Sequence, residues 1–385
     1  MQPIQQLSPV GKSIIESFIR QRTRTPDQFH RAISPEDEMY LFHVSDAPNG
    51  DVDDWCLNYF ESGALMIEEL RPVFERLFGG FDQVGSLLEF ACGHGRFTRH
   101  LIQELPPEKI TVSDIYADAV SFQKNEFGVN GQVSATEPRD YHDENRYDCI
   151  LVCSLFSHLP ERTFQLWLER LLSLLTEDGV LIFTVHDEAV GPSTSKTPGP
   201  NIQFIPESES RSLDKNVYGT TFVNEEFCQQ AIRKAAHGSV HYARLPKALW
   251  RFQDIYAVSH GNEERLKSLK PERGLEGYID RCQSIAGQTY FSGWAYDFRW
   301  NEKVDLIEIL EDGERIQVCI PSTERTDVAA HFGNSAMTGC GWVCMVEDSR
   351  LKPESIISVQ FTSSTGERHV AAFDSLGKLR KSLIS

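Results

Sequence analysis

The sequence predicts an α/β fold: a seven-stranded, mostly parallel sheet, with N-terminal helices before it and a separate all-β sandwich after it. Three observations predict this class. The first 80 residues carry apolar side chains at helical spacing, residues from about 86 alternate short apolar runs with amphipathic stretches, and past residue 270 only strand-like runs remain. We therefore expect a helical cap over 1–80, a main domain over 81–262 and an accessory domain over 275–385.

The N-terminal segment contains two stretches with a helical period. They are SIIESFIRQ and WCLNYFESGALMIEELRPVFERLF. The acidic, polar residues between them (SPEDE, then SDAPNGDVDD) predict a loop.

Seven apolar runs predict the strands of the main domain. In chain order they are SLLEFACG, KITVSDIY, GQVSAT, YDCILVCS, GVLIFTVHD, HYARL and QDIYAVSH. Four helical patterns separate them: GRFTRHLIQEL, ADAVSFQKNEF, ERTFQLWLERLLSLL and NEEFCQQAIRKAA. Apolar strands that alternate with helices predict a parallel sheet covered on both faces.

The accessory domain follows a linker, GNEERLKSLKPERG. Its expected strands are YFSGWAYDF, VDLIEILEDG, RIQVCI, GWVCMVED, SIISVQFTSS and HVAAFDS. Short strands at roughly ten-residue spacing, joined by turns such as Glu311-Asp312-Gly313, are typical of a β-sandwich.

Composition excludes several classes of function. The net charge of −18 opposes binding of nucleic acid, and no run of about 18 apolar residues is present that could span a membrane. The N-terminus has no basic start followed by an apolar run, so we expect a cytoplasmic protein. Its nine cysteines are scattered and form no CxxC pair, which fits a reducing compartment and no structural zinc.

The most informative segment runs from Leu87 to Phe97, LLEFACGHGRF. A strand that turns into a helix through Gly93 and Gly95 lets the backbone approach a ligand closely, because no Cβ intervenes. Asp114 ends the second strand, 19 residues after Gly95, where a carboxylate can bind both hydroxyls of a ribose. Together they predict a site for a nucleoside-containing cofactor.

The segment resembles the first motif of class I methyltransferases that depend on S-adenosylmethionine (SAM), E/D-x-x-x-G-x-G, with Glu89, Gly93 and Gly95 at its fixed positions. A dinucleotide site usually has a third small residue where this chain has Thr98. The resemblance covers residues 86–260, and includes Asp114-Ile115, the segment SLFSHLP after the fourth strand, and a closing pair of strands, the last one antiparallel. It implies a Rossmann-like methyltransferase sheet with SAM as the cofactor.

On the matching positions, the resemblance also implies the cofactor-binding residues. They are Tyr59, Gly63, Glu89, Ala91, Cys92, Gly93, Gly95, Arg96, Asp114, Ile115, Ser134, Ala135, Thr136, Cys153 and Ser154. The family often has an acid at the end of the third strand, and this chain has none there unless Glu137 substitutes.

Several of these residues have a structural alternative. Glu89 would then be a strand-end acid bound by backbone N–H groups, and Asp114 would cap the helix that starts near Asp118. Tyr59 would be a core residue of an amphipathic helix. Cys92 and Cys153 would serve packing.

Methyl transfer to a hydroxyl needs a base, and histidine is suited to that task near neutral pH. His158 and His186 follow the fourth and fifth strands and are the expected catalytic residues, whereas His94 is expected to be exposed. His158 has an alternative role as a structural residue at a helix entry. With Asp187, the two histidines match no closed ligand pattern, so we expect no metal.

The stretch from about 188 to 221 is too long for a bare connection, so we expect a lid or acceptor-binding loop, or else a disordered one. Phe204 and Tyr218 are its expected substrate contacts.

The C-terminal module loosely resembles small β-sandwich modules attached to bacterial glycan-modifying enzymes, through Gly293-Trp294-Ala295 and the segment RTDV at 325–328. Trp294, Trp300 and Trp342 suit either sugar stacking or a sandwich core. Glycan binding, and a scaffold or homo-oligomer interface, both stay open.

The leading hypothesis is an enzyme that O-methylates a small molecule or saccharide, such as a glycan or nucleotide-sugar intermediate. One alternative is an NAD(P)-dependent oxidoreductase, which the missing third glycine and the lack of a Tyr-x-x-x-Lys pattern disfavour. The other is a non-catalytic binding or regulatory protein with a degenerate methyltransferase domain, which Glu89, Gly93, Gly95 and Asp114 argue against.

Overall fold

The computed structural model describes residues 6–46, 52–191, 201–210 and 212–382. The chain divides into two compact units, one built on residues 28–271 and the other on residues 7–27 together with the segment from 272 onward. The expected helical cap is therefore split, because its first helix, α1 (Pro9–Arg22), belongs to the second unit. There Phe18 packs edge-on against Phe373, with ring centroids 5.5 Å apart. Helical spacing revealed the buried face of α1 but not its partner.

The first unit is built around a nine-stranded sheet. Its main path runs in the order β3-β2-β1-β4-β5-β7-β6; β9 also pairs with β5, and β8 pairs with β9. The bounds are β1 (Leu87–Phe90), β2 (Ile110–Asp114), β3 (Asn130–Val133), β4 (Tyr147–Val152), β5 (Leu175–Asp187), β6 (Ile202–Ile205), β7 (Thr220–Val223), β8 (His241–Leu249) and β9 (Gln253–Ser259). The strands β1 to β5 are parallel, and β9 runs antiparallel to β5 as expected.

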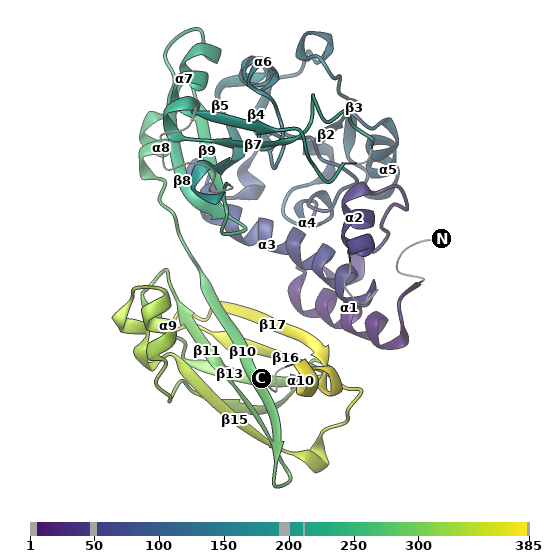
Figure 1. Cartoon of the computed structure of the whole chain (residues 1–385), viewed down its shortest axis with the longest axis vertical. Coiled ribbons are helices and arrows are strands. Elements are labelled where there is room, and N and C mark those ends of the chain that lie inside the picture. Colours follow the sequence, from purple (N-terminus) through teal and green to yellow (C-terminus); the bar gives the residue numbers. More distant parts are fainter. Residues whose placement is uncertain (1–5, 47–51, 192–200, 211, 383–385) are drawn as a thin grey trace. The chain divides into compact units, whose positions relative to one another are not determined.

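Helices cover both faces of this sheet (Figure 1). Neighbouring residues of a strand point to opposite faces, so each central strand contributes side chains to two cores. Leu87 joins a core formed with α3 (Val52–Phe78), α4 (Thr98–Leu101), α5 (Ala117–Phe127) and α8 (Glu263–Ser268). Leu88 joins the opposite core, formed with α6 (Glu161–Leu172) and α7 (Glu225–Ala235). The predicted Rossmann-like fold class is confirmed.

The number of strands differs from the expected seven. The stretch expected as a loop over 188–221 contributes β6 and the start of β7, which pair as an antiparallel hairpin with Phe204 opposite Thr221. Residues 192–200 and 211 of that stretch lie outside the described residues.

The helices differ from expectation at two places. A short helix, α2 (Glu38–Asp46), forms within the acidic stretch expected as a loop. The Asp37 carboxylate accepts from the N–H groups of Met39 and Tyr40 at 3.0 and 3.1 Å, which satisfies two unpaired donors at the start of α2. The helix expected over 95–105 is reduced to the four residues of α4, flanked by turns.

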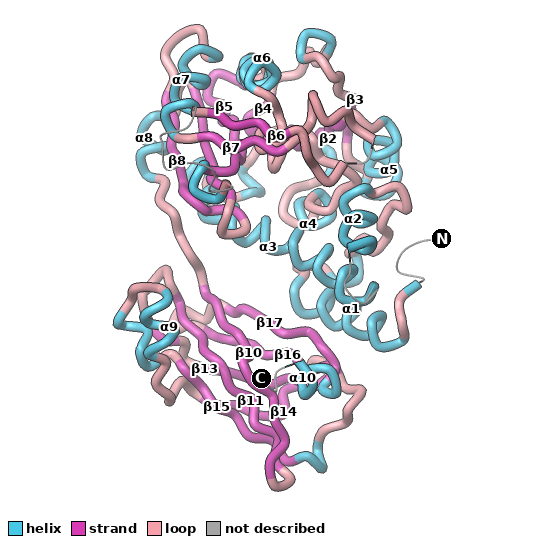
Figure 2. Tube along the Cα trace, viewed as in Figure 1, coloured by secondary structure: helices cyan, strands magenta, loops and turns pink. Residues whose placement is uncertain are grey.

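The second unit consists mainly of strands (Figure 2), arranged in two four-stranded antiparallel sheets. One sheet contains β10 (Leu275–Ile285), β11 (Gln288–Asp297), β12 (Glu302–Lys303) and β15 (Gly341–Glu347); the other contains β13 (Leu306–Glu311), β14 (Glu314–Cys319), β16 (Ile356–Thr362) and β17 (Arg368–Ser375). Short helices α9 (Thr326–His331) and α10 (Leu376–Ser382) accompany them. Phe291 and Trp342 of one sheet share a core with Ile309 and Phe361 of the other.

The tryptophans of this unit occupy different environments. Trp342 is fully buried and Trp294 is 7% exposed, so both are core residues in this fold. Trp300 is 57% exposed.

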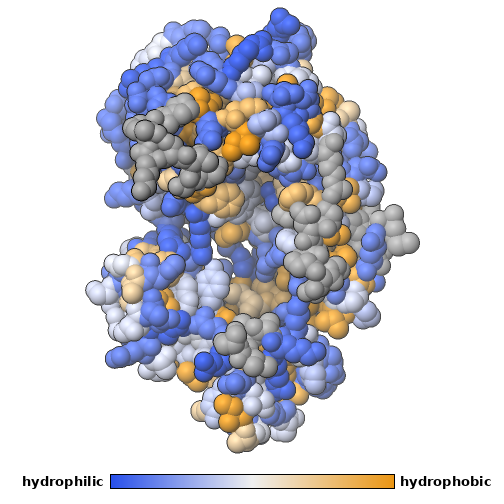
Figure 3. Space-filling model, viewed as in Figure 1, coloured by the Kyte–Doolittle hydropathy of each residue, from blue (hydrophilic) through white to orange (hydrophobic). Residues whose placement is uncertain are grey.

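Elsewhere on the surface drawn in Figure 3, hydrophilic residues predominate and apolar residues appear in scattered patches. Among the residues described, no helix has both the length and the apolar character of a membrane span.

Candidate active site

The turn after β1 contains three residues with left-handed backbone: Ala91 at φ 59°, Gly93 at φ 56° and Gly95 at φ 83°. A Cβ added at Gly93 would meet no atom within 4 Å, so this stretch of backbone borders open space. A Cβ added at Gly95 would lie closer than 3.0 Å to Phe127 of α5. The two glycines therefore have different roles: Gly93 leaves room for a ligand, and Gly95 lets α5 pack against the turn.

Asp114, at the end of β2, holds this turn. One carboxylate oxygen accepts from the Gly93 N–H at 2.8 Å and the other accepts from the Tyr116 N–H at 3.0 Å. Burial raises the pKa of Asp114, and the two backbone N–H groups act in the opposite direction. The N-cap position of α5 is occupied by Tyr116, so Asp114 does not have the alternative role of a helix cap.

Glu89, in β1, lies beneath the same turn and is buried. Its carboxyl accepts a hydrogen bond from the Thr98 hydroxyl at 2.8 Å. Thr98, which stands where a dinucleotide motif has its third glycine, therefore binds Glu89 here. Burial raises the pKa of Glu89 to about 8, although the nearby positive charge of Arg96 lowers it. The Arg96 guanidinium lies over the Trp250 ring, 5.1 Å from its centroid.

The expected cap residues Tyr59 and Gly63, both in α3, lie against this region. The Tyr59 hydroxyl donates to Asp37 at 2.6 Å, and the buried Arg99 lies over its ring at 5.2 Å. A Cβ at Gly63 would lie closer than 3.0 Å to the backbone oxygen of Arg96, so Gly63 allows α3 to approach the turn closely. These contacts hold α3 on the turn and give both residues a packing role.

The remaining residues expected at the cofactor occupy varied positions. Cys92 is buried and accepts from the Gln123 amide at 3.0 Å, while Ile115, Ala135 and Cys153 are half-buried. Thr136, beyond the end of β3, is exposed.

Two further expectations concern His94 and Glu137. The expectation of an exposed His94 is wrong: its ring is buried and pairs with Asp118 at 3.1 Å, because the turn brings it against α5. Glu137 binds Arg162 through two hydrogen bonds of 3.1 and 3.2 Å and so faces away from the turn.

His158 and His186 lie together at the carboxyl ends of β4 and β5, with ring centroids 6.3 Å apart. His158 is buried, its Nδ1 lies 2.6 Å from the backbone oxygen of Gly219, and its Nε2 lies 3.5 Å from a carboxylate oxygen of Glu209. The Tyr218 ring stacks on it at 4.5 Å with an interplanar angle of 10°. Burial, with a smaller contribution from His158, lowers the pKa of His186 to about 4.

The β6–β7 hairpin positions Tyr218 and closes this side of the site. The N–H groups of Gly219 and Thr221 donate to the backbone oxygens of His158 and Ser157 at 2.9 and 2.7 Å. The loop between the two strands also reaches α2 and the start of α5, where Ser210 donates to Glu38 at 2.9 Å and lies 3.5 Å from the Tyr116 hydroxyl. The expected substrate residue Phe204 packs against Gly219. One loop therefore contacts Tyr116, which follows Asp114, and His158.

A polar cluster that was not predicted from the sequence lies beside His186. Gln253 is buried and hydrogen-bonds with Thr184, Ser154 and His186. A signal was present: Gln253 begins the antiparallel strand β9, whose first residue must lie at the carboxyl edge of β5, and Thr184 is a polar residue inside an apolar run. Ser154, expected at the cofactor, has left-handed backbone at φ 62°.

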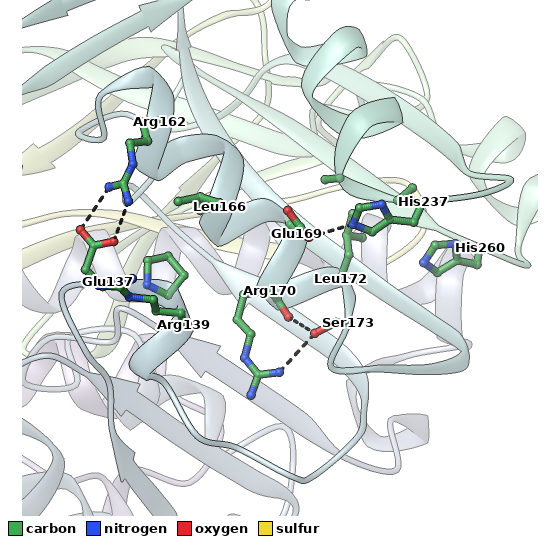
Figure 4. A pocket seen from close by; sticks show the side chains of 13 residues that line it. Glu137, Arg139, Arg162, Leu166, Glu169, Arg170, Leu172, Ser173, His237 and His260 are labelled. Carbon is green, nitrogen blue, oxygen red and sulfur yellow. Dashed lines mark hydrogen bonds and ion pairs between the residues drawn. The ribbon is translucent and has the colours of Figure 1, made fainter.

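A pocket of about 500 Å³ lies elsewhere, between the outer surfaces of α6 and α7 (Figure 4). Its charged side chains pair with one another, Arg162 with Glu137 and His237 with Glu169. None of its lining residues belongs to the turn or to the histidine pair. In the described part of the chain, no group of three His, Cys, Asp or Glu side chains is placed to hold a metal ion.

Comparison with known proteins identifies the family of this chain. The model of a family described as "Methyltransferase domain" matches residues 63–275, more than half of the chain. A ribosomal RNA small subunit methyltransferase C from Shewanella sediminis (strain HAW-EB3) is 30% identical over 160 residues, which cover 36% of this chain and 46% of that protein. The chain thus spans about half the length of this relative.

Solved structures with a similar fold include a SAM-dependent methyltransferase from Clostridium acetobutylicum ATCC 824, with 15% identity and a TM-score of 0.36 over 53% of this chain and 92% of that chain. The plantazolicin methyltransferase BpumL in complex with SAH has 14% identity and a TM-score of 0.38, and the match covers 67% of this chain and 99% of that chain.

Proposed function

Because this chain belongs to the methyltransferase-domain family, we propose that it transfers the methyl group of SAM to an oxygen atom of a small molecule or saccharide. The observation that carries the proposal is the contact between Gly93 and Asp114. It combines left-handed backbone beside open space with a carboxylate at the end of the neighbouring strand. A nucleoside-containing cofactor needs both features within reach of each other.

The residues around the turn fit SAM chemically. Backbone at Gly93 borders open space for the cofactor, and Asp114 offers a carboxylate to ribose hydroxyls. Arg96 supplies a positive charge near Glu89 for the methionine carboxylate. When bound, SAM supplies a methyl group that is already activated on a sulfonium centre. The protein then has to position the acceptor and accept one proton.

His158 is the residue best placed to accept that proton. A neutral imidazole that donates from Nδ1 to the Gly219 oxygen carries its lone pair on Nε2. When Nε2 takes up the proton of an acceptor hydroxyl, Glu209 lies 3.5 Å away to stabilise the resulting positive charge. The stack with Tyr218 fixes the plane of the ring.

A second acceptor class comes from the curated relative, whose name states that it acts on ribosomal RNA. The net charge of −18 opposes an RNA acceptor, because phosphate groups need a positive surface. Neutral small molecules and saccharides therefore have priority in an acceptor screen, with a fragment of small-subunit ribosomal RNA as the comparison.

The proposal is tested by isothermal titration calorimetry of SAM and its demethylated product, with the Asp114→Ala variant. We expect micromolar binding that Asp114→Ala weakens at least tenfold, since an ordered turn and a ribose contact are lost together, each of about 1 kcal/mol. Asp140→Ala, at an exposed position, is the matched control and should bind like the wild type. Absence of SAM binding to a folded wild-type protein would refute the proposal.

A further inference from the structure

His186 has one satisfied ring nitrogen and one unsatisfied ring nitrogen. Its Nε2 lies 3.2 Å from the amide nitrogen of Gln253. Its Nδ1 is enclosed and finds no hydrogen-bond partner among the described residues. An enclosed polar group without a partner is costly, so native proteins rarely keep one without a reason.

The position of the ring proton follows from a chain of hydrogen bonds that starts at the backbone. The Ser154 N–H, which can only donate, points to the Thr184 hydroxyl oxygen at 2.9 Å. The Thr184 hydroxyl lies 2.7 Å from the side-chain oxygen of Gln253 and donates its own proton there. Reversing the Gln253 amide would remove this acceptor from Thr184, which is fully buried. The amide orientation of Gln253 is therefore determined.

The same chain then determines the tautomer of His186. With its oxygen toward Thr184, Gln253 directs its NH₂ group to the Ser154 hydroxyl at 3.0 Å and to Nε2 of His186. An amide NH₂ group only donates, so Nε2 must carry a lone pair and the ring proton must be on Nδ1. His186 is thus a hydrogen-bond donor at Nδ1 and is not placed to act as the base.

We propose that His186 binds an oxygen atom of the acceptor through its Nδ1–H group, and that Gln253 is a positioning residue that holds the proton on that nitrogen. The inference rests on the proposed function and assigns a different role to each of the two histidines. His158 accepts the proton, and His186 orients the acceptor.

The surroundings of His186 indicate the chemical class of the acceptor. The rings of Phe222 and Phe252 lie 5.6 and 5.7 Å from its own ring, so the flanking surface is apolar and flat. The charged groups nearby are occupied: Glu209 faces His158, and Asp187 is paired with Arg244 at 2.6 Å. A neutral N–H donor between aromatic rings suits an uncharged hydroxyl, carbonyl or ether oxygen. An ammonium group at this position could not accept the hydrogen bond.

The test is ¹⁵N NMR of protein labelled in its histidine side chains, without cofactor or acceptor, with the His186→Gln variant used to assign the signals. In the wild type we expect His186 to be neutral near pH 7.5, with a protonated Nδ1 and an unprotonated Nε2. In Gln253→Glu, a carboxylate oxygen faces Nε2, so the proton should move to Nε2 or the His186 pKa should rise by more than about one unit. Thr184→Val keeps the shape but removes the hydroxyl, and should give a mixture of the two tautomers.

Gln230→Glu is the matched control, because it makes the same chemical change at an exposed position of α7 and should leave the His186 signals unchanged. A wild-type His186 that carries its proton on Nε2 would overturn the inference. Unchanged His186 signals in a folded Gln253→Glu variant would do so as well.

A kinetic measurement separates the substrate role from a structural one. Once an acceptor has been identified, Gln253→Glu should raise the KM for that acceptor about tenfold, while the affinity for SAM stays unchanged. Loss of SAM binding in this variant would instead point to a structural role. The NMR result does not depend on SAM, so this inference and the proposed function can fail independently.

Discussion

The two glycines of the turn make the sharpest test of the structure, because the same substitution should have different effects at positions two residues apart. Alanine at either position must adopt left-handed backbone, at φ 56° for Gly93 and φ 83° for Gly95. That conformation costs an L-residue about 1–2 kcal/mol. At Gly93 the added methyl group meets no atom within 4 Å, so no further cost arises.

At Gly95 the methyl group also collides with neighbouring side chains. It would lie closer than 3.0 Å to Phe127 and 3.1 Å from the amide of Gln123. Both neighbours are buried in α5 and have little room to move, and overpacking of this kind costs about 1–3 kcal/mol. We therefore expect Gly93→Ala to lower the free energy of unfolding by about 1–2 kcal/mol and Gly95→Ala by about 2–5 kcal/mol.

The assay is urea unfolding followed by circular dichroism, combined with SAM calorimetry on the folded variants. Gly93→Ala should remain folded and lose SAM affinity at least tenfold, since its methyl group occupies the space assigned to the cofactor. Gly128→Ala, where the added Cβ is equally unobstructed and φ is 71°, controls for the backbone cost and should bind SAM normally. Equal destabilisation by the two substitutions, or unchanged SAM binding in Gly93→Ala, would refute the reasoning.

Two further predictions concern buried charged groups near the same turn. Arg99→Met should lower the free energy of unfolding by about 3–5 kcal/mol, because three backbone oxygens lose their hydrogen-bond donor. The control is Arg139→Met, at an exposed position, which should change the free energy of unfolding little. Equal effects of the two substitutions in urea unfolding would contradict the prediction. The pKa of Glu89 is about 8 in the folded protein, against about 4.3 when unfolded, so the folded state holds a proton that the unfolded state releases. Stability from Glu89 is therefore present at low pH and lost as pH rises toward 8. Relative to Glu89→Gln, the wild type should lose roughly 2–4 kcal/mol between pH 5 and 9 in urea unfolding, and a flat difference would show that Glu89 is ionised in the fold.

Local pattern was sufficient for the strands β1, β4 and β5 at the centre of the main sheet. The central parallel strands β1 and β4 are apolar runs, because a strand buried on both faces leaves no room for alternation, and Leu87 and Leu88 of β1 enter opposite cores. The turn at Gly93 and the carboxylate of Asp114 were predictable for the same reason, since a strand end, a glycine turn and an acid on the next strand are all read along the chain. The antiparallel β9 followed from resemblance to a family.

Pairing between distant segments was not predictable from local pattern. The β6–β7 hairpin forms from a polar stretch, and its position depends on backbone hydrogen bonds to Ser157 and His158, about 60 residues away along the chain. The burial of His94 depends on its contact with Asp118 of α5.

The class of the fold, the glycine turn after β1 and the placement of His158 and His186 near the ends of β4 and β5 could be predicted from the sequence, because each follows from local pattern. Three other features follow from tertiary contacts alone: the unit to which α1 belongs, the burial of Trp294 and Trp342, and the hydrogen bond between Gln253 and His186. These outcomes depend on which surfaces meet and which donor faces which acceptor. A hydrogen bond such as that between Thr184 and Gln253 joins atoms 69 residues apart, and no periodicity in the chain encodes it.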